Sequence, residues 1–241
     1  MIVSYDSVDN FPGWALAEGY FKSLIAEHAC GRILEIGSGA NPTLSPQFVR
    51  TSGLSYVTSD VSQEELKKTD LAFEQLVLDL TAKNVDPTLN GRFDCVLSRM
   101  VGEHISDGRQ YHQNIYKLLR PGGISAHCFS TLWAFPFTAN RVLPESLTGP
   151  LLNAISPRDE HQHAKFKAYY SWSRGPSNSM IRRFQSLDFE IVNYTGYFGH
   201  LYYRRRWPWL DQLEKQKSKL LLAHPVPQLC SYATIVLRKP S

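Results

Sequence analysis

The chain has 241 residues, which fits one domain with elaborations. Apolar residues make up 43% and charged residues 20% of the sequence, and this excludes disordered, collagen-like and fibrous proteins. Residues 1–150 hold 12 Lys and Arg against 16 Asp and Glu, whereas residues 151–241 hold 14 against 6. The net charge of +4 is therefore concentrated in the C-terminal part, where any surface for an anionic partner is expected.

The sequence gives no sign of a membrane span or an export signal. No apolar run approaches the roughly 18 residues of a transmembrane helix, and the acidic N-terminal segment has no apolar centre. We therefore expect a cytoplasmic protein. The four cysteines are buried thiols in this interpretation, because their spacing is typical of neither a zinc site nor a disulfide framework.

The predicted elements begin with one amphipathic helix over residues 11–29, expected as a cover over the functional edge of a sheet. Five short apolar runs then alternate with helix-like or turn-rich stretches. We expect these strands at residues 32–36, 54–59, 75–78, 93–98 and 123–129. The alternation predicts βαβ units, and the nearly continuous apolar runs predict a parallel sheet with helices on both faces.

Helix starts are indicated by Ser62 with Glu65, which form a capping box, and by Asp107 before an apolar pattern of helical period. After residue 130 the alternation stops, and residues 131–175 are expected to be an insertion. The rest of the chain predicts helices at about 177–186 and 208–222 and strands at 188–194 and 231–239.

The predicted fold is a single α/β domain built on a doubly wound, Rossmann-like sheet of seven strands. The sheet is mostly parallel, with an antiparallel final strand. Residues 1–30 form its N-terminal cover, 31–130 a ligand-binding core, 131–175 an insertion after the fifth strand, and 176–241 the last two strands and helices.

The strongest local signal is the glycine turn after the first core strand, Gly37-Ser38-Gly39-Ala40-Asn41-Pro42. Glycine lets a ligand approach the backbone closely. The turn lacks the Gly-Lys-Ser/Thr ending of a phosphate loop, and Pro42 stands where a dinucleotide fingerprint has glycine. Glu35, just before the turn, is better suited to an ammonium or sulfonium group than to a pyrophosphate.

Two more acids follow successive strands of the predicted sheet. Asp60 ends the second strand and can accept hydrogen bonds from both hydroxyls of a ribose. Asp79 ends the third strand and can accept one from an adenine amino group. Each acid alone is also typical of a loop or a helix cap, but three acids at successive strand ends favour one shared ligand.

These residues resemble the motifs of class I S-adenosylmethionine-dependent methyltransferases, including the small-molecule, type 11-like members. Glu35 with Gly37 and Gly39 matches the first motif, Asp60 the acid of the second strand, and Asp79-Leu80 the third motif. Residues 93–98 with Glu103-His104 resemble the fourth motif, and residues 118–123 resemble the next. Asn41 departs from the pattern by replacing the third glycine.

The resemblance implies S-adenosylmethionine as the cofactor and gives roles to these residues. Glu35 and the backbone around Ser98 would hold the methionine end, Asp60 the ribose, and Asp79 with Leu80 the adenine. The complete implied set is Glu35, Gly37, Ser38, Gly39, Asn41, Asp60, Val61, Asp79, Leu80 and Ser98.

A catalytic base is required only if the methyl acceptor must lose a proton early. His104 is the candidate, because it follows the fourth strand near the expected methyl position; the alternative is that it packs locally. His127 lies inside a strand and is expected in the core. His161 and His163 have the spacing of a metal pair without a third ligand, so we predict no metal site.

The insertion is the predicted acceptor site, because it leaves the carboxyl end of a parallel strand. Its candidate substrate-binding residues are Trp133, Arg141, Tyr170 and Trp172, whose rings could equally bury the insertion against the domain. A small-molecule acceptor is expected: transfer to an oxygen or nitrogen of a sugar, a glycan precursor or a secondary metabolite.

Two other functions remain open. The stretch around Arg204, Arg205 and Arg206, with the Lys-rich helix after it, is either a connection with solvated arginines or a surface for nucleic acid or anionic lipid. Methylation of RNA is therefore one alternative. A cofactor fold used only for binding or as a scaffold, without catalysis, is the other.

Overall fold

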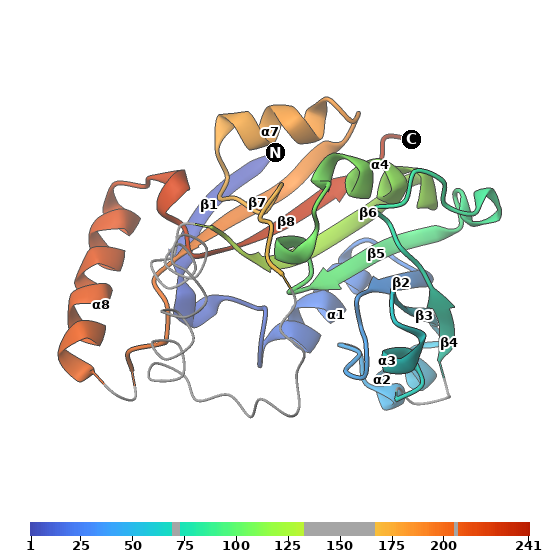
Figure 1. The fold of residues 1–241 in the computed structure, drawn as a ribbon, viewed down its shortest axis with the longest axis horizontal. Helices are drawn as coiled ribbons and strands as arrows, with labels where there is room; N and C mark the ends of the chain where they lie inside the picture. The colour runs from blue at the N-terminus through green and yellow to red at the C-terminus, as the bar shows by residue number, and fades with distance from the viewer. Residues whose placement is uncertain (69–72, 133–166, 205–206) are drawn as a thin grey trace.

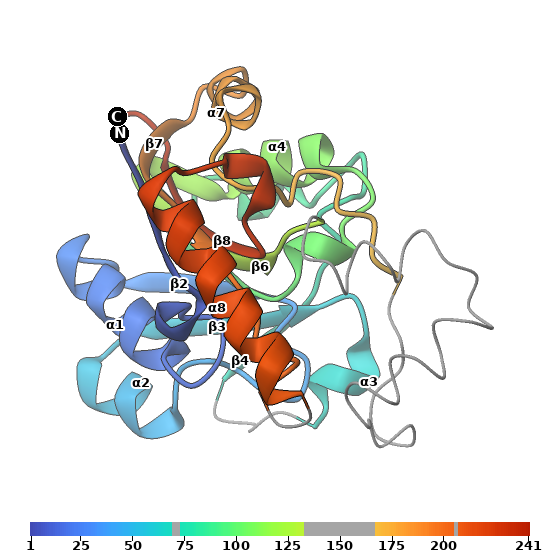
Figure 2. The same cartoon turned by 90° about the vertical axis from the view of Figure 1, so that its left-hand side faces the viewer.

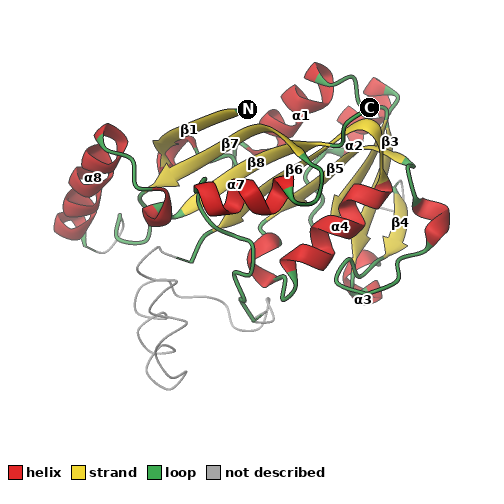
Figure 3. Cartoon of the chain, turned by 90° about the horizontal axis from the view of Figure 1, so that it is seen from above, coloured by secondary structure: helices red, strands yellow, loops and turns green. Residues whose placement is uncertain are grey.

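The computed structural model describes residues 1–68, 73–132, 167–204 and 207–241. Figure 1 shows one twisted sheet at the centre of the described chain, and Figure 3 shows helices lying on both of its faces. The strands are β1 (Ile2–Ser7), β2 (Arg32–Ile36), β3 (Ser55–Asp60), β4 (Glu74–Val77), β5 (Phe93–Arg99), β6 (Leu119–Ser130), β7 (Glu190–Phe198) and β8 (Tyr232–Arg238). The helices are α1 (Ala17–Glu27), α2 (Pro46–Ser52), α3 (Gln63–Leu66), α4 (Gly108–Leu118), α7 (Asn178–Gln185) and α8 (Pro208–Ala223).

The strand order across the sheet is β1-β7-β8-β6-β5-β2-β3-β4. Only β8 runs antiparallel to its neighbours β6 and β7; the other pairings are parallel. The predicted doubly wound, Rossmann-like sheet with an antiparallel final strand is thus confirmed. All seven predicted strands are present within a few residues of their expected bounds.

The N-terminal segment differs from the prediction. Residues Ile2–Ser7 form β1, an eighth strand that pairs in parallel with β7 at the edge of the sheet. A strand here was not expected because its apolar residues do not enter the core: Ile2 is 64% exposed. The last two strands therefore do not form the sheet's edge, since β1 lies outside β7.

Helix α1 is shorter than the predicted 11–29 and begins only at Ala17. Pro12 and Gly13 favour a turn rather than a helix interior, which explains the late start. Before the helix, Phe11 and Trp14 pack on Tyr232 of β8, with ring centroids 4.7 and 4.9 Å from the tyrosine ring. The apolar residues of this segment are therefore used partly in a turn rather than along one helix face.

The core consists of two layers, one on each face of the sheet. On one face, Tyr111 and Ile115 of α4 and Phe184 of α7 pack on the strands; on the other, Phe21 and Leu24 of α1 do so. The predicted helix caps are present, because the Ser62 and Asp107 side chains accept hydrogen bonds from the third amide of α3 and α4. The two layers bury both faces of the sheet.

The sheet topology determines where a ligand binds. From β2 the chain moves to β3 and β4 on one side, and then crosses to β5 on the other side of β2. Residue Ile36 of β2 lies between Ser59 and Ser98 of its two neighbours. The carboxyl end of β2 is therefore the switch point at which open α/β sheets bind ligands.

Candidate functional site

The glycine turn leaves β2 at the switch point in a left-handed backbone conformation. Gly37 has φ +65° and Gly39 has φ +48°, values that residues other than glycine rarely adopt. A Cβ on Gly37 would lie 2.5 Å from Cγ2 of Val101, so this glycine is required by the protein's own packing. The turn is closed by the Ser38 amide, which donates to the Ser59 carbonyl at 3.0 Å.

Glu35 is buried beneath this turn, with 2% of its surface exposed. Its carboxylate accepts hydrogen bonds from the Thr43 amide at 2.9 Å, from the Thr43 hydroxyl at 2.5 Å and from the Tyr56 hydroxyl. Burial raises the pKa of Glu35. Both carboxylate oxygens are thus bound within the protein, to Thr43 of the loop after the turn and to Tyr56 of β3.

Arg99 at the end of β5 was missed by the sequence analysis. Its Nη2 donates to the Asn41 carbonyl at 3.0 Å, and its Nε donates to the Thr43 hydroxyl at 3.1 Å. These bonds connect β5 to the loop that Glu35 holds. The only signal in the sequence was a charged residue directly after an apolar strand.

The two strand-end acids have different surroundings. Asp60 is half-buried, and a Cβ on Gly39 would lie 3.5 Å from its Oδ2, so the carboxylate lies beside the turn. Its Oδ1 accepts from the Ser62 amide at 2.9 Å. Asp79 is exposed and accepts from the amide and hydroxyl of Thr81. The structure thus brings Asp60 to the glycine turn, while Asp79 also stabilises a local turn.

The residues next to these acids are also at this edge. Val61 is 65% exposed, whereas Leu80 is buried. The Leu80 carbonyl accepts a hydrogen bond at 2.9 Å from the side-chain amide of Asn114, a fully buried residue of α4. Asn114 also donates to the Ala82 carbonyl at 2.8 Å, so α4 fixes the loop after β4.

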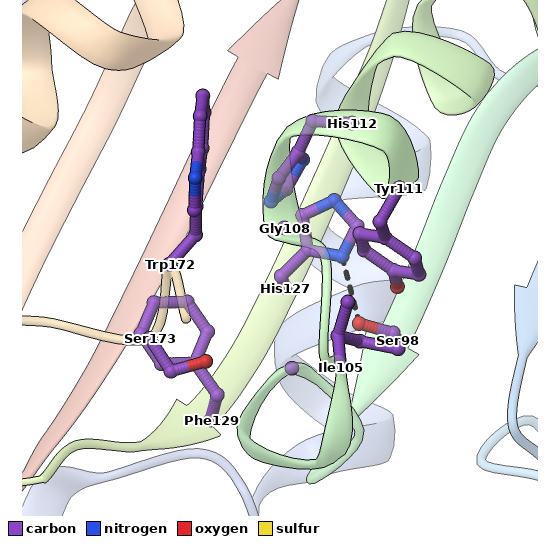
Figure 4. Close-up of a pocket in the computed structure, with 10 residues that line it drawn as sticks. Ser98, Ile105, Gly108, Tyr111, His112, His127, Phe129, Trp172 and Ser173 are labelled. Atoms are coloured by element: carbon purple, nitrogen blue, oxygen red, sulfur yellow. Dashed lines mark hydrogen bonds between the residues drawn. The ribbon is translucent and has the colours of Figure 1, made fainter. Parts of the chain in front are cut away.

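A small cavity lies between the ends of β5 and β6 and helix α4 (Figure 4). It is lined by Ser98, Gly102, Ile105, Gly108, Tyr111, His112, His127, Phe129, Trp172 and Ser173. Ser98 and His127 are hydrogen bonded to each other, with Oγ 2.7 Å from Nδ1. Burial lowers the pKa of His127 to about 3 and also lowers that of His112, so both imidazoles are neutral and the lining carries no charge.

Two of the four expected acceptor residues lie in the described part of the chain. Trp172 lines the cavity and stacks on His112, with ring centroids 5.6 Å apart. Tyr170 is 5% exposed and its amide donates to the Glu103 carbonyl at 3.0 Å, so it lies under the surface. Trp133 and Arg141 lie outside the described residues, as do His161 and His163.

His104 lies in the 3-10 turn Gly102–His104 after β5 and is partly exposed. Its Nδ1 is 3.1 Å from the Lys167 carbonyl. Because a carbonyl only accepts, Nδ1 carries a proton, which makes Nε2 the ring atom that could accept one. Its neighbour Glu103 is buried, which raises the pKa of that carboxyl, and accepts from the Ser130 hydroxyl at 3.0 Å.

The part of the chain that the structure describes has no group of three or more His, Cys, Asp or Glu that could hold a metal ion. None of its helices is both long and apolar enough to cross a membrane.

The edge around β2 fits S-adenosylmethionine by the chemistry of its groups. The left-handed glycine turn presents backbone to a ligand, and the Asp60 carboxylate lies beside it as an acceptor for hydroxyls. The glycine turn and the residues next to it include no lysine that could bind a phosphate. Such a set suits a nucleoside with a cationic tail better than a pyrophosphate.

Comparisons with solved structures agree on the fold. A putative sarcosine dimethylglycine methyltransferase from Galdieria sulphuraria has a TM-score of 0.53 and 12% identity, over 93% of this chain and 85% of that one. A putative S-adenosylmethionine-dependent methyltransferase from Listeria monocytogenes has a TM-score of 0.54 and 11% identity, over 92% and 97%. The [4+2]-cyclase SpnF has a TM-score of 0.53 and 14% identity, over 100% and 87%. At these identities the likeness shows the fold alone, and the cyclase shows that this fold also carries other reactions.

The family is shown by the sequence. A family model described as a methyltransferase domain matches residues 17–193, which is most of the chain and includes the glycine turn and all three strand-end acids. No curated protein matches the sequence. The chain therefore belongs to the methyltransferase domain family and is an enzyme that uses S-adenosylmethionine.

Proposed function

We propose that the protein transfers the methyl group of S-adenosylmethionine to an oxygen or nitrogen of a small, uncharged acceptor, such as a sugar, a glycan precursor or a secondary metabolite. The observation that carries this proposal is the cavity next to the end of β5. Its lining combines aromatic rings with hydroxyls and two neutral imidazoles and holds no charged side chain. Such a lining suits a hydroxyl or another small polar group of the acceptor, since the cavity itself has room for about one water molecule.

In this proposal the cofactor residues act at the edge around β2. Asp60, with Val61 next to it, binds the ribose; Asp79 and Leu80 bind the adenine; and the backbone at Ser98 faces the methionine end. Gly37, Ser38, Gly39 and Asn41 form the turn that the ligand covers. Glu35 acts through Thr43, as a positioning residue for the loop after the turn.

When bound, S-adenosylmethionine supplies an electrophilic methyl group, so the protein mainly has to orient the acceptor in line with it. We propose that His104 accepts a proton from the acceptor at Nε2, because its Nδ1 proton is directed to the Lys167 carbonyl. Trp172 orients the acceptor as one wall of the cavity. Trp133 and Arg141 remain predicted substrate-binding residues. Tyr170 is buried and would support the acceptor site from below, through its hydrogen bond to the Glu103 carbonyl.

The first experiment is calorimetric titration with S-adenosylmethionine and S-adenosylhomocysteine, with NAD as the control. We expect micromolar binding of the first two and none of NAD. A panel of sugars, phenols and amines with radiolabelled cofactor then tests the acceptor class. The acceptor proposal fails if cofactor binds but label appears only on RNA, or on none of these substrates.

The role of His104 is tested once an acceptor is found. The variant His104→Asn should lower kcat by roughly 100-fold or more and leave cofactor affinity unchanged, because a general base contributes about 10²–10⁴-fold. The exposed His224 provides a matched control as His224→Asn. Equal kcat in the two variants would show that His104 is not the base.

RNA methylation is the second candidate, favoured by the basic C-terminal part of the chain. Against it, Arg204 is bound to Asp9 at 2.7 Å, while Lys215 and Lys217 are bound to Asp211 and Glu214. Replacing Arg204, Arg205 and Arg206 with glutamine should leave methylation of the small acceptor intact. Loss of label from RNA in that variant would support the RNA alternative.

A further inference from the structure

Helix α8 buries two polar side chains against the protein and leaves three large apolar side chains exposed. On the inner side, Asp211 and Ser218 are 7% and 8% exposed. On the outer side, Trp209, Leu213 and Leu220 are 64%, 54% and 67% exposed. At about 100° per residue these three fall within a sector of about 40°, and they span about 16 Å along the helix. We call Trp209, Leu213 and Leu220 the outer stripe.

The described part of the chain packs on the inner side of α8 and leaves the outer stripe exposed. The helix is held from its inner side, where Leu221 packs with Phe198 and Cys230. The same side approaches the backbone closely, because a Cβ on Gly199 would lie 2.7 Å from Oγ of Ser218. Figures 1 and 3 show α8 at one end of the sheet, beyond β1, and Figure 2 views the molecule from that end, with α8 in front of the strands and no other labelled helix or strand before it. The stripe is therefore available to a partner.

The charges around the stripe are positive on the outside. Helix α8 holds three lysines, Lys215, Lys217 and Lys219, against the two acids Asp211 and Glu214. The two acids are turned inward, with side chains 9% and 11% exposed, while their partners Lys215 and Lys217 are 50% and 47% exposed. By helical spacing, Lys217 and Lys219 lie on opposite flanks of the stripe. A partner of this surface is therefore apolar where it meets the stripe and anionic on both sides of it.

We propose that the outer face of α8 docks on an anionic phospholipid bilayer. A bilayer accepts leucine and tryptophan side chains at the boundary of its acyl chains and places phosphates at the level of flanking lysines. A second copy of the chain fits less well, because two such faces would bring lysines against lysines. RNA phosphates would pair with the lysines, but RNA offers no apolar surroundings in which the exposed leucines could be buried.

The test is sedimentation of the full-length protein with sucrose-loaded vesicles. One set is phosphatidylcholine alone, and the other contains 30% phosphatidylglycerol as a chosen composition. We expect wild-type protein to pellet with the anionic set at low salt and at least tenfold more weakly with the neutral set. The variant Leu213→Gln with Leu220→Gln should lose at least tenfold in affinity for the anionic vesicles.

The matched control is Leu222→Gln with Leu229→Gln, which removes two leucines that are 37% and 45% exposed and lie outside the stripe. It should bind like wild type, and circular dichroism should show both variants folded, since all four side chains are on the surface. Equal pelleting of the two double variants would overturn the proposal. A concentration-dependent dimer that the stripe variant abolishes would also overturn it. Binding to poly(U) RNA without vesicle binding would do so too, if the stripe variant abolished the RNA binding.

Discussion

In the proposed cofactor site, Asp60 is the residue that is expected to bind the ribose. Its carboxylate lies beside Gly39 at the turn, and one oxygen is bound to the Ser62 amide. Hydrogen bonds to a charged group contribute about 1.5–3 kcal/mol each. Asp60→Ala should therefore weaken S-adenosylhomocysteine binding by about tenfold or more in a calorimetric titration. The exposed neighbour Glu64 serves as control, and equal affinity of Asp60→Ala and Glu64→Ala would remove Asp60 from the ribose site.

Thr43 carries the connection between Glu35 and Arg99. Its hydroxyl donates to Glu35 and accepts from Arg99, so the isosteric change Thr43→Val leaves two buried or half-buried partners unsatisfied. We expect a loss of about 1–3 kcal/mol in the free energy of unfolding by urea, together with weaker cofactor binding. Thr51→Val is the control, because that hydroxyl is exposed and bonds only to carbonyls of its own helix. A similar small effect of both changes would show that the loop does not depend on Thr43.

The positions of single residues could be predicted from the sequence only where the residue stands at the end of a predicted strand. Asp60 and the glycine turn were placed together because parallel strands end at one edge. The Thr43 partner of Glu35 could not be predicted, since Thr43 reaches it only after the loop folds back over β2, whereas Tyr56 reaches it from the neighbouring strand β3. Arg99 was missed for the same reason, because its acceptor on the loop lies 58 residues away in the chain.

At the scale of elements, β6 and α4 share a buried histidine pair that makes stability depend on pH. Burial lowers the pKa of His127 to about 3 from an ordinary 6.5, so the unfolded chain binds its proton first as pH falls. The contribution is complete above pH 6.5 and is lost as pH falls toward 3. Between pH 6.5 and 5 this corresponds to about 2 kcal/mol.

The change His127→Gln tests this pH dependence, because glutamine keeps a hydrogen-bonding group near Ser98 and does not titrate. Urea unfolding at pH 7.5 and pH 5 should show a loss on acidification that is about 2 kcal/mol smaller in the variant than in wild type. His224→Gln, at an exposed position, should keep the wild-type difference. The same difference in all three proteins would mean that His127 takes up its proton without unfolding.

Prediction of whole elements succeeded where a strand is buried on both faces. The strands β2, β5 and β6 read as continuous apolar runs because helices cover both of their sides. The edge strand β1 has no such pattern, since only its pairing with β7 holds it in the sheet. For α8 the sequence analysis left a lipid surface open beside a plain connection, because a sequence period gives the width of an apolar face but not its direction.

At the scale of the molecule, one continuous sheet runs from β1 to β4. The proposed cofactor site joins the ends of β2, β3 and β5. A ligand bound there should stabilise the whole domain in one cooperative transition rather than one part of it. At a concentration of 100 times Kd, S-adenosylhomocysteine should add about 2.7 kcal/mol to the free energy of unfolding. For a chain of this length the expected rise in Tm is roughly 5–10 °C.

Differential scanning calorimetry measures this rise, with NAD at the same concentration as the control ligand and Asp60→Ala as the control protein. NAD should leave Tm unchanged, and at the same ligand concentration Asp60→Ala should gain less, since a tenfold weaker site loses about 1.4 kcal/mol of the stabilisation. An equal rise with NAD would contradict the cofactor assignment. Two separate transitions, only one of them shifted by ligand, would instead show that the β1 edge of the sheet unfolds independently of the site, and that binding energy is not shared across the sheet.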